Sequence, residues 1–303
     1  MGANPILKKL GFSDDDRVVI LHADDIGMCE TSVSTFDELM ERGSLTSGAT
    51  MVPCSWFPAA ASYCRAHPEV DMGVHLTLTS EWATYRWRPT STTDPESGLI
   101  DEAGYFFSTT EAVQQHARPD FVRAEAMSQV NQALAAGVDV SHIDMHMGAM
   151  LHPKFLPAYL EVARTQQIPM LALRMSEAEL SRWNNPQLAA HVKQSLDSLE
   201  EEGFPIVDHF RQTALNEPET RLEEIRQMLE TLPPGLTHFI THPAHDTPEL
   251  RAITPDWAGR VADYKALVTD EFLAYLKEFH IHTISYTDLR DVVRGNKMEG
   301  THA

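Results

Sequence analysis

Short apolar runs alternate with amphipathic segments along most of the chain. The runs of strand length are residues 18–23, 45–52, 70–76, 140–144, 168–173, 204–207, 236–240 and 280–285. Helical periodicity occupies residues 32–42, 155–165, 221–229 and 257–278, and Gly43 is expected to end the first of these helices. Eight strand–helix units predict an α/β fold, a single irregular, TIM-like (β/α) barrel over residues 1–303, rather than an open doubly wound sheet.

Residues 79–110 break this rhythm. The segment has no clear periodicity, yet it contains six aromatic residues, namely Trp82, Tyr85, Trp87, Tyr105, Phe106 and Phe107. Long insertions in compact domains are usually functional or disordered, and the aromatic content argues against disorder. Two interpretations stay open: a lid that binds substrate, or an apolar cover over the barrel helices.

Composition narrows the classes of partner and compartment. The formal net charge of −20 argues against nucleic acids and anionic membranes, since both require basic surfaces. The three cysteines form no CxxC motif and are expected to be reduced, and the first residues lack the apolar core of a signal peptide. No apolar run approaches the roughly 20 residues that span a bilayer. We therefore expect a cytoplasmic protein that acts on a small molecule, and a homo-oligomer is compatible with the sequence.

Residues able to carry chemistry follow the predicted strands. They are Asp24, Asp25, His75, His146, Arg174 and His242. In a barrel, the carboxyl ends of parallel strands share one rim, where active sites of this architecture lie. One acid and two imidazoles from separate strand ends are a typical set of ligands for a catalytic divalent metal. The sequence therefore predicts a metal site on this rim.

Five ordered motifs resemble one known family. They are Ala23-Asp24-Asp25-Ile26-Gly27, Ser47 with Met51-Val52-Pro53, Gly73-Val74-His75-Leu76, His142-Ile143-Asp144-Met145-His146 and Thr241-His242-Pro243. Together they resemble the YdjC-type carbohydrate deacetylases and span about residues 18–290. The resemblance implies a deformed (β/α) barrel, a divalent metal held by an Asp and two His residues, and hydrolysis of the N-acetyl group of amino sugars such as chitooligosaccharides.

The resemblance also implies a role for each motif residue. Asp25, His75 and His146 are the expected metal ligands, and Asp24 is the expected general base. The sequence leaves open which of the two acids takes which role. Mixed Asp/His ligation is compatible with Zn²⁺ or Mg²⁺, our first expectations, and with Mn²⁺ or Co²⁺.

Further residues are expected to support these groups. His242 is expected to be the general acid, with His245 as the competing assignment. Arg174 resembles the family arginine that orients the catalytic acid. His142 and Asp144 are expected to support the ligands, because they share a face of one strand with His146.

Two other functions remain open. One is a metal-dependent phosphoesterase or another amidohydrolase on the same fold, and the other is a non-catalytic sugar-binding protein. Many family members carry a His-rich run after the second histidine motif, whereas this chain continues with Met147-Gly148-Ala149-Met150. The identity of the sugar therefore does not transfer from the resemblance.

Overall fold

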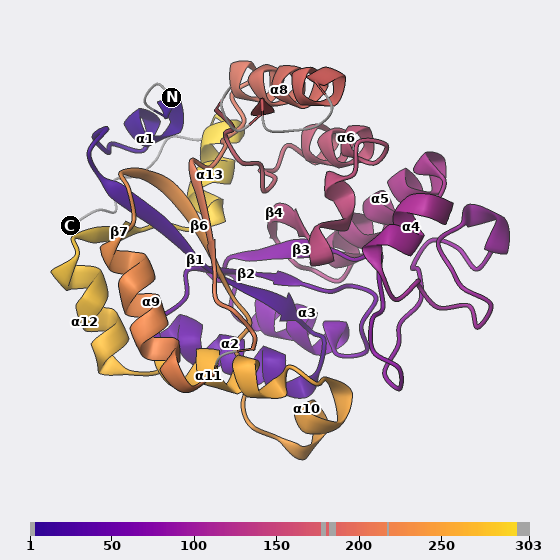
Figure 1. Cartoon of the computed structure of the whole chain (residues 1–303), viewed down its shortest axis with the longest axis horizontal. Helices are drawn as coiled ribbons and strands as arrows, with labels where there is room; N and C mark the ends of the chain where they lie inside the picture. Colours follow the sequence, from indigo (N-terminus) through magenta and orange to yellow (C-terminus); the bar gives the residue numbers. More distant parts are fainter. Residues whose placement is uncertain (1–3, 177–179, 182–185, 217, 296–303) are drawn as a thin grey trace.

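A computed structural model describes residues 4–176, 180–181, 186–216 and 218–295 (Figure 1). The strands are β1 (Arg17–Ile26), β2 (Ser47–Thr50), β3 (Met72–Leu76), β4 (Val140–Met145), β5 (His209–Gln212), β6 (Gly235–Thr241) and β7 (Ile281–Thr283). All of the pairs between these strands are parallel. The strand β1 lies at the centre, and almost every side chain on it is buried.

The strands are arranged in the order β4-β3-β2-β1-β6-β5. The strand β6 pairs with β1 along one side, while the other side is shared by β7 at the start of β1 and β2 towards its end. Beyond β4, single parallel bridges join Ile143 to Met170 and Leu173 to Val207, directly before β5. These bridges complete a ring of parallel chain segments, so the predicted α/β barrel is confirmed in its irregular form.

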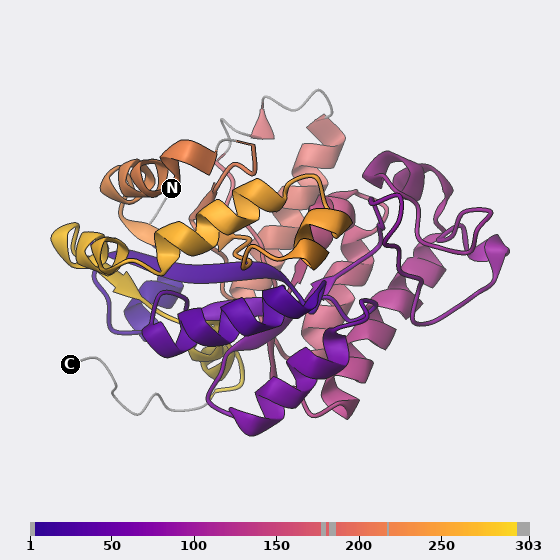
Figure 2. The same ribbon diagram turned by 90° about the horizontal axis from the view of Figure 1, so that it is seen from below.

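Helices surround the strands on the outside (Figures 1 and 2). They are α1 (Pro5–Lys9), α2 (Glu30–Arg42), α3 (Phe57–Ala66), α4 (Thr110–His116), α5 (Pro119–Ala135), α6 (Leu156–Gln166), α8 (Pro186–Glu201), α9 (Arg221–Glu230), α10 (Pro248–Ile253), α11 (Trp257–Leu267), α12 (Asp270–Glu278) and α13 (Tyr286–Val293). Among them, α2 packs against β1, α5 against β3 and α13 against β4. No helix within the described residues is long and apolar enough to cross a membrane.

Most predicted elements are present, and three differ. The predicted strand 168–173 is reduced to two isolated bridges and the predicted strand 204–207 to one, and the regular strand β5 begins only after them. The predicted helix 257–278 is two helices, because the Thr269 side chain accepts the N–H of Phe272 and starts α12 anew. Gly43 ends α2 in the left-handed conformation (φ 78°), as predicted.

The segment 79–110 is held by tertiary contacts in place of regular structure. It contains one short 3₁₀ turn, Pro95–Ser97, and a bridge between Ile100 and Phe106. The buried carboxylate of Glu125, on α5, accepts the backbone N–H groups of Thr90 and Ser91 at 2.9 and 2.8 Å. Hydrogen bonds of this kind carry no periodicity, which explains why the sequence shows no pattern here.

Candidate active site

A β-bulge at the end of β1 turns two neighbouring carboxylates towards one side. Ala23 pairs with Gly48 and Ile26 with Thr50, so β1 contains one more residue than β2 over the same stretch. Asp25 occupies this bulge with a φ of 62°, a left-handed conformation that is uncommon outside glycine. Adjacent strand residues normally face opposite sides. The bulge therefore allows both acids to approach the same histidine.

Three donor atoms from three strand ends meet beside this bulge. Asp25 Oδ1 lies 3.2 Å from His146 Nδ1 and 3.5 Å from His75 Nε2. The three ligand atoms are all within 4.8 Å of one another, and the three residues are buried. Asp25 Oδ1 has no hydrogen-bond partner in the described part of the chain, which is costly for a buried carboxylate oxygen. These residues fit a divalent metal.

Each of the two histidines has a carboxylate on its other nitrogen. Asp144 Oδ1 lies 2.7 Å from His75 Nδ1, and Glu81 Oε1 lies 2.7 Å from His146 Nε2. Burial alone would lower the pKa of both imidazoles, but Asp144, Asp24 and Asp25 outweigh burial at His75, and Glu81 and Asp25 outweigh it at His146. The pKa of His75 is raised to about 9, and the pKa of His146 is also raised well above its usual value. Carboxylate partners of this kind fix the ring orientation of a metal-ligating histidine.

Asp24 is surrounded by imidazoles. Its Oδ1 lies 2.8 Å from His22 Nδ1, and its Oδ2 lies 3.8 Å from both His75 Nε2 and His242 Nε2. Burial would raise the pKa of Asp24, but the adjacent His75 and His22 outweigh burial and hold the pKa well below its usual range. Asp24 is therefore a buried carboxylate with one oxygen directed towards His75 and His242.

His242 and His245, the two candidates for the general acid, differ in their surroundings. His242 is buried, and its Nδ1 has no hydrogen-bond partner among the described residues. His245 instead bonds Glu38 on α2, with 2.9 Å between Nε2 and Oε2, and packs edge-on against Tyr264. The structure thus brings His242, and not His245, to Asp24.

A second buried cluster lies behind the first. Its members are His22, Asp24, Asp144 and His238, whose donor atoms also lie within 4.8 Å of one another. Both nitrogens of His22 are already engaged, by Asp24 and by His142. A metal would have to break one of these bonds, so Asp25, His75 and His146, called the metal-binding set below, are the better candidate for holding a metal.

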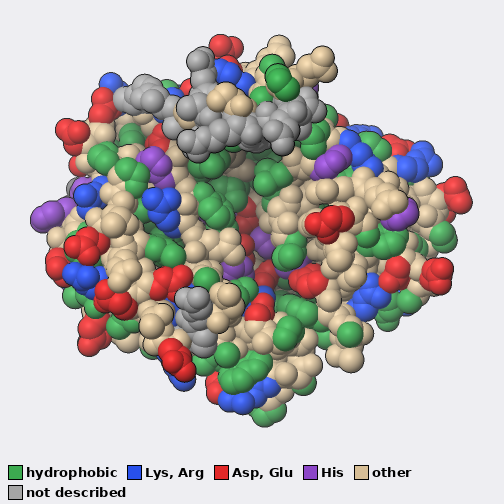
Figure 3. All heavy atoms as spheres, in the orientation of Figure 1, with side chains coloured by type: hydrophobic (Ala, Val, Ile, Leu, Met, Phe, Trp, Pro, Cys, Tyr) green, Lys and Arg blue, Asp and Glu red, His purple; other side chains and the backbone are tan. Residues whose placement is uncertain are grey.

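The face that carries these strand ends is hollowed at its centre. Figure 3 shows acidic and histidine side chains on the floor of the hollow, with apolar side chains along its walls. A small molecule can therefore approach the buried acids and imidazoles from this face.

Comparison with known proteins agrees with this geometry. The family model described as YdjC-like protein matches residues 18–278. The chain belongs to the YdjC-like family. A carbohydrate deacetylase of Thermus thermophilus is 37% identical over 91% of this chain and 95% of its own length. A carbohydrate deacetylase of Thermoanaerobacter pseudethanolicus is 24% identical over 90% of this chain and 100% of its own length.

A solved structure has the same fold. It is a protein of Enterococcus faecalis that is described as a cellobiose-phosphate cleavage protein. It is 22% identical, with a TM-score of 0.73, and the match covers 90% of this chain and 99% of that one. This similarity supports the assignment of the barrel.

One predicted residue of this YdjC-like protein lies elsewhere. Arg174 contacts Asp208 and Glu200, each at 3.1 Å, and Asp208 in turn accepts the backbone N–H of Leu236. Leu236 is near the start of β6, whereas His242 follows the end of that strand. The structure thus pairs the Arg174 side chain with Asp208 and Glu200, and its expected role in orienting the catalytic acid stays a prediction.

Three residues of the site were missed by the sequence analysis. Arg260 on α11 donates from Nη1 to Asp25 Oδ2 (2.8 Å), Glu81 bonds His146, and His22 bonds Asp24. Arg260 is in the middle of an amphipathic helix, and Glu81 is in the aperiodic segment, so neither has a local signal. His22 is two residues before Asp24 and on the same strand, which is the one signal that could have revealed it.

Proposed function

We propose that this protein is a metal-dependent carbohydrate deacetylase that hydrolyses the N-acetyl group of an amino sugar or small oligosaccharide and releases acetate. The observation that carries the proposal is the set Asp25, His75 and His146 beside Asp24 and His242, in which Asp25 Oδ1 has no hydrogen bond within the described residues. Membership of the YdjC-like family and the carbohydrate deacetylases among its relatives support the same reaction.

Amide hydrolysis requires an activated water, stabilisation of a developing oxyanion and a proton for the leaving amine. A divalent ion held by Asp25, His75 and His146 would supply a Lewis acid, which lowers the pKa of water and polarises the acetyl carbonyl. Asp24 Oδ2, directed towards these ligands, accepts the proton of the attacking water. Its low pKa keeps it ionised, and so able to accept a proton, at neutral pH.

His242 is the proposed general acid. It lies 3.8 Å from Asp24 Oδ2, the oxygen that His75 also approaches, and donates a proton to the sugar nitrogen as the C–N bond breaks. Arg260 holds the second oxygen of Asp25, which leaves Oδ1 for the metal. Zn²⁺ and Mg²⁺ are the ions we propose first for this ligand set.

The alternative phosphoesterase reaction has less support. Phosphate substrates usually require free cationic side chains. The arginine at this site, Arg260, is paired with Asp25 and Asp256.

Acetate release is the direct test. Purified protein should release acetate from N-acetylglucosamine oligomers after loading with Zn²⁺ or Mg²⁺, and a chelator should abolish the release. Phosphate release from sugar phosphates without acetate release would support the phosphoesterase. Binding of the oligomers without turnover, under all metals tested, would support the sugar-binding protein.

A further inference from the structure

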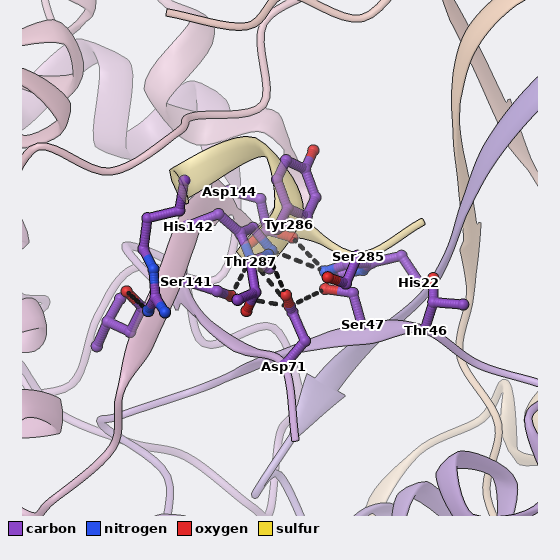
Figure 4. A network of polar contacts seen from close by, with 12 residues as sticks. His22, Thr46, Ser47, Asp71, Ser141, His142, Asp144, Ser285, Tyr286 and Thr287 are labelled. Carbon is purple, nitrogen blue, oxygen red and sulfur yellow. Dashed lines mark hydrogen bonds and ion pairs between the residues drawn. The ribbon is translucent and has the colours of Figure 1, made fainter. Parts of the chain in front are cut away.

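A chain of buried side chains leads from Asp24 away from the metal-binding set. From Asp24 Oδ1 it continues through His22 (2.8 Å), His142 (2.9 Å) and Ser141 (2.8 Å) to Asp71 Oδ1 (2.8 Å). Figure 4 shows this series of side chains from His22 to Asp71, which come from β1, from β4 and from the residue directly before β3. All five residues are buried. The proposed reaction uses only the first of them.

Asp71 anchors the far end of the chain. Its Oδ1 accepts the hydroxyl of Ser47 at 2.6 Å as well as that of Ser141, and its Oδ2 accepts the backbone N–H of Thr287 at the start of α13 (Figure 4). A carboxylate surrounded by donors acts only as an acceptor. Asp71 therefore sets the direction of the hydrogen bonds that follow.

The order of donor and acceptor set by Asp71 continues through the imidazole rings of His142 and His22. Because Ser141 donates its hydroxyl proton to Asp71, its oxygen must accept the N–H of His142 Nδ1. The other nitrogen of His142, Nε2, is then an acceptor and takes the N–H of His22 Nε2. Because Asp24 is ionised and can only accept, the contact between its Oδ1 and His22 Nδ1 requires a proton on Nδ1 as well, so His22 donates from both ring nitrogens.

Packing holds the rings in place. The ring of Tyr286 stacks on His142, with centroids 3.8 Å apart and planes 14° apart. A side chain at Gly73 would put a Cβ atom 2.4 Å from the His142 ring, so only glycine is compatible with this position of the ring. Burial and the neighbouring His22 lower the pKa of His142 well below its usual value, which keeps the ring neutral. A ring flip would break two hydrogen bonds at once.

We propose that Asp71, Ser141 and His142 are positioning residues that fix the Nε2–H bond and the ring plane of His22, and through it the carboxylate of Asp24. His22 holds Oδ1, so that Oδ2 stays directed towards His75 and His242. This inference rests on the proposed function, in which Asp24 is the general base. A positioning role of this kind affects turnover and leaves metal binding intact.

Ser141→Ala is the decisive variant, because the loss of one oxygen atom removes the hydrogen bonds that link Asp71 to His142. We expect kcat for acetate release to fall by about 10- to 100-fold, with KM and metal content unchanged within about twofold. Ser141→Thr restores the hydroxyl and should recover most of the rate. Tyr286→Phe is the matched control, since it removes a buried hydroxyl that bonds His238, outside the chain, and keeps the ring over His142.

Nitrogen NMR of the histidine rings tests the same inference without turnover. In the wild-type protein, His142 should carry its proton on Nδ1, and Ser141→Ala should change the shifts of both His142 and His22. Protonation of His142 at Nε2, or a rate loss in Tyr286→Phe equal to that in Ser141→Ala, would overturn the proposal. Absence of acetate release by the wild-type protein would refute only the proposed function. The nitrogen shifts of the histidine rings would still show whether the hydrogen bonds from Asp71 to His22 run in the proposed direction.

Discussion

Adjacent carboxylates on one strand end acquire different chemistry from their different partners. Asp25 Oδ2 is neutralised by Arg260, and its Oδ1 is left beside His75 and His146. Asp24 instead contacts imidazoles alone among the ion pairs described for it. A guanidinium on one oxygen favours an ionised carboxylate with one free lone-pair site, which suits a ligand.

Substitution of each acid should therefore separate binding from turnover. Asp25→Asn should lose stoichiometric metal, as measured by elemental analysis after dialysis. Asp24→Asn should retain metal and lose about 10²- to 10⁴-fold in kcat, because the general base is gone. Loss of metal in Asp24→Asn, with retention in Asp25→Asn, would reverse the two assignments.

The proposed general acid gives a prediction that depends on the leaving group. An amine needs a proton as the C–N bond breaks, whereas a phenolate from an activated acetyl ester leaves without one. His242→Ala should therefore reduce hydrolysis of an N-acetyl sugar by about 10²-fold or more, and hydrolysis of a nitrophenyl acetate much less. Rates on both substrates, with equal metal content, provide the measurement.

His245→Ala is the matched control for this experiment. His245 is on the same loop but bonds Glu38, so its removal should change both rates by less than about threefold. An amide-selective loss in His245→Ala, without one in His242→Ala, would show that His245 is the general acid. Equal losses on the amide and the ester in His242→Ala would indicate a role in binding.

Single residues of the site could be predicted where they stand at the end of a recognisable apolar strand. Asp24, Asp25, His75, His146 and His242 each follow a strong apolar run, and the structure brings all five together. Arg174 follows an equally apolar run, but its side chain contacts Asp208 and Glu200, because side-chain pairing between distant segments is not encoded locally. Contacts such as those of Glu81 and Arg260 depend on tertiary packing that no short pattern reports.

At the scale of elements, the insertion 79–110 is coupled to the metal-binding set by its first residues. Glu81 orients His146, and the indole of Trp87 packs edge-on towards the same imidazole, with centroids 6.3 Å apart. Trp82 and Trp87 are buried against each other, with centroids 5.4 Å apart, so their rings are not available to stack on a sugar. For these two residues, the structure favours the interpretation as an apolar cover and not the interpretation as a substrate-binding lid.

This coupling predicts that the insertion tunes metal affinity. Glu81→Gln replaces the charged acceptor of the His146 Nε2 proton with a neutral amide and should weaken metal binding by about 10- to 100-fold. Isothermal titration of the metal-free protein with Zn²⁺ measures this directly.

Glu125→Gln separates orientation of the ligand from order in the insertion. Glu125 also holds the insertion by its carboxylate, but it does so at Thr90 and Ser91 and has no contact with the histidine ligands among its described bonds. Its variant should bind metal within about threefold of the wild type. Equal weakening in both variants would show that Glu81 acts only through the order of the insertion.

The strands show how far an element could be predicted. Runs buried on both faces, such as β1, β4 and β6, were predicted within a few residues. The run 168–173 is as apolar, but it meets its neighbours at single bridges. Hydrogen bonding to both neighbours, which makes a strand regular, depends on how the barrel closes and is absent from the local pattern.

At the scale of the whole molecule, the barrel encloses a layer of histidines with opposite electrostatic surroundings. The carboxylates around His75 and His146 raise their pKa values, and burial with the adjacent His22 lowers the pKa values of His142 and His238 well below the usual value. The chain therefore buries imidazoles that favour charge next to imidazoles that resist it. Stability must depend on pH through both kinds.

In mildly acidic solution, the pH dependence of the free energy of unfolding is set by the imidazoles that resist charge, His142 and His238. In the unfolded chain, His142 and His238 take up protons near pH 6.5, whereas in the folded protein they stay neutral. The unfolded state then binds more protons, so the free energy of unfolding falls as pH drops from about 6.5 to 5, by up to about 1.4 kcal/mol per pH unit for each residue. His75 and His146 act mainly above this window, where their stabilisation is lost as pH rises towards about 9.

Urea unfolding of the metal-free protein between pH 5 and 6.5 measures this dependence. His238→Asn, which keeps an amide near the hydroxyl of Tyr286 and removes the titrating ring, should reduce the slope by about one proton. His191→Asn, on the exposed surface of α8, is the control and should keep the wild-type slope. A wild-type protein whose stability rises as pH falls through this window would contradict the burial of neutral imidazoles, because the folded state would then be the one that takes up the protons.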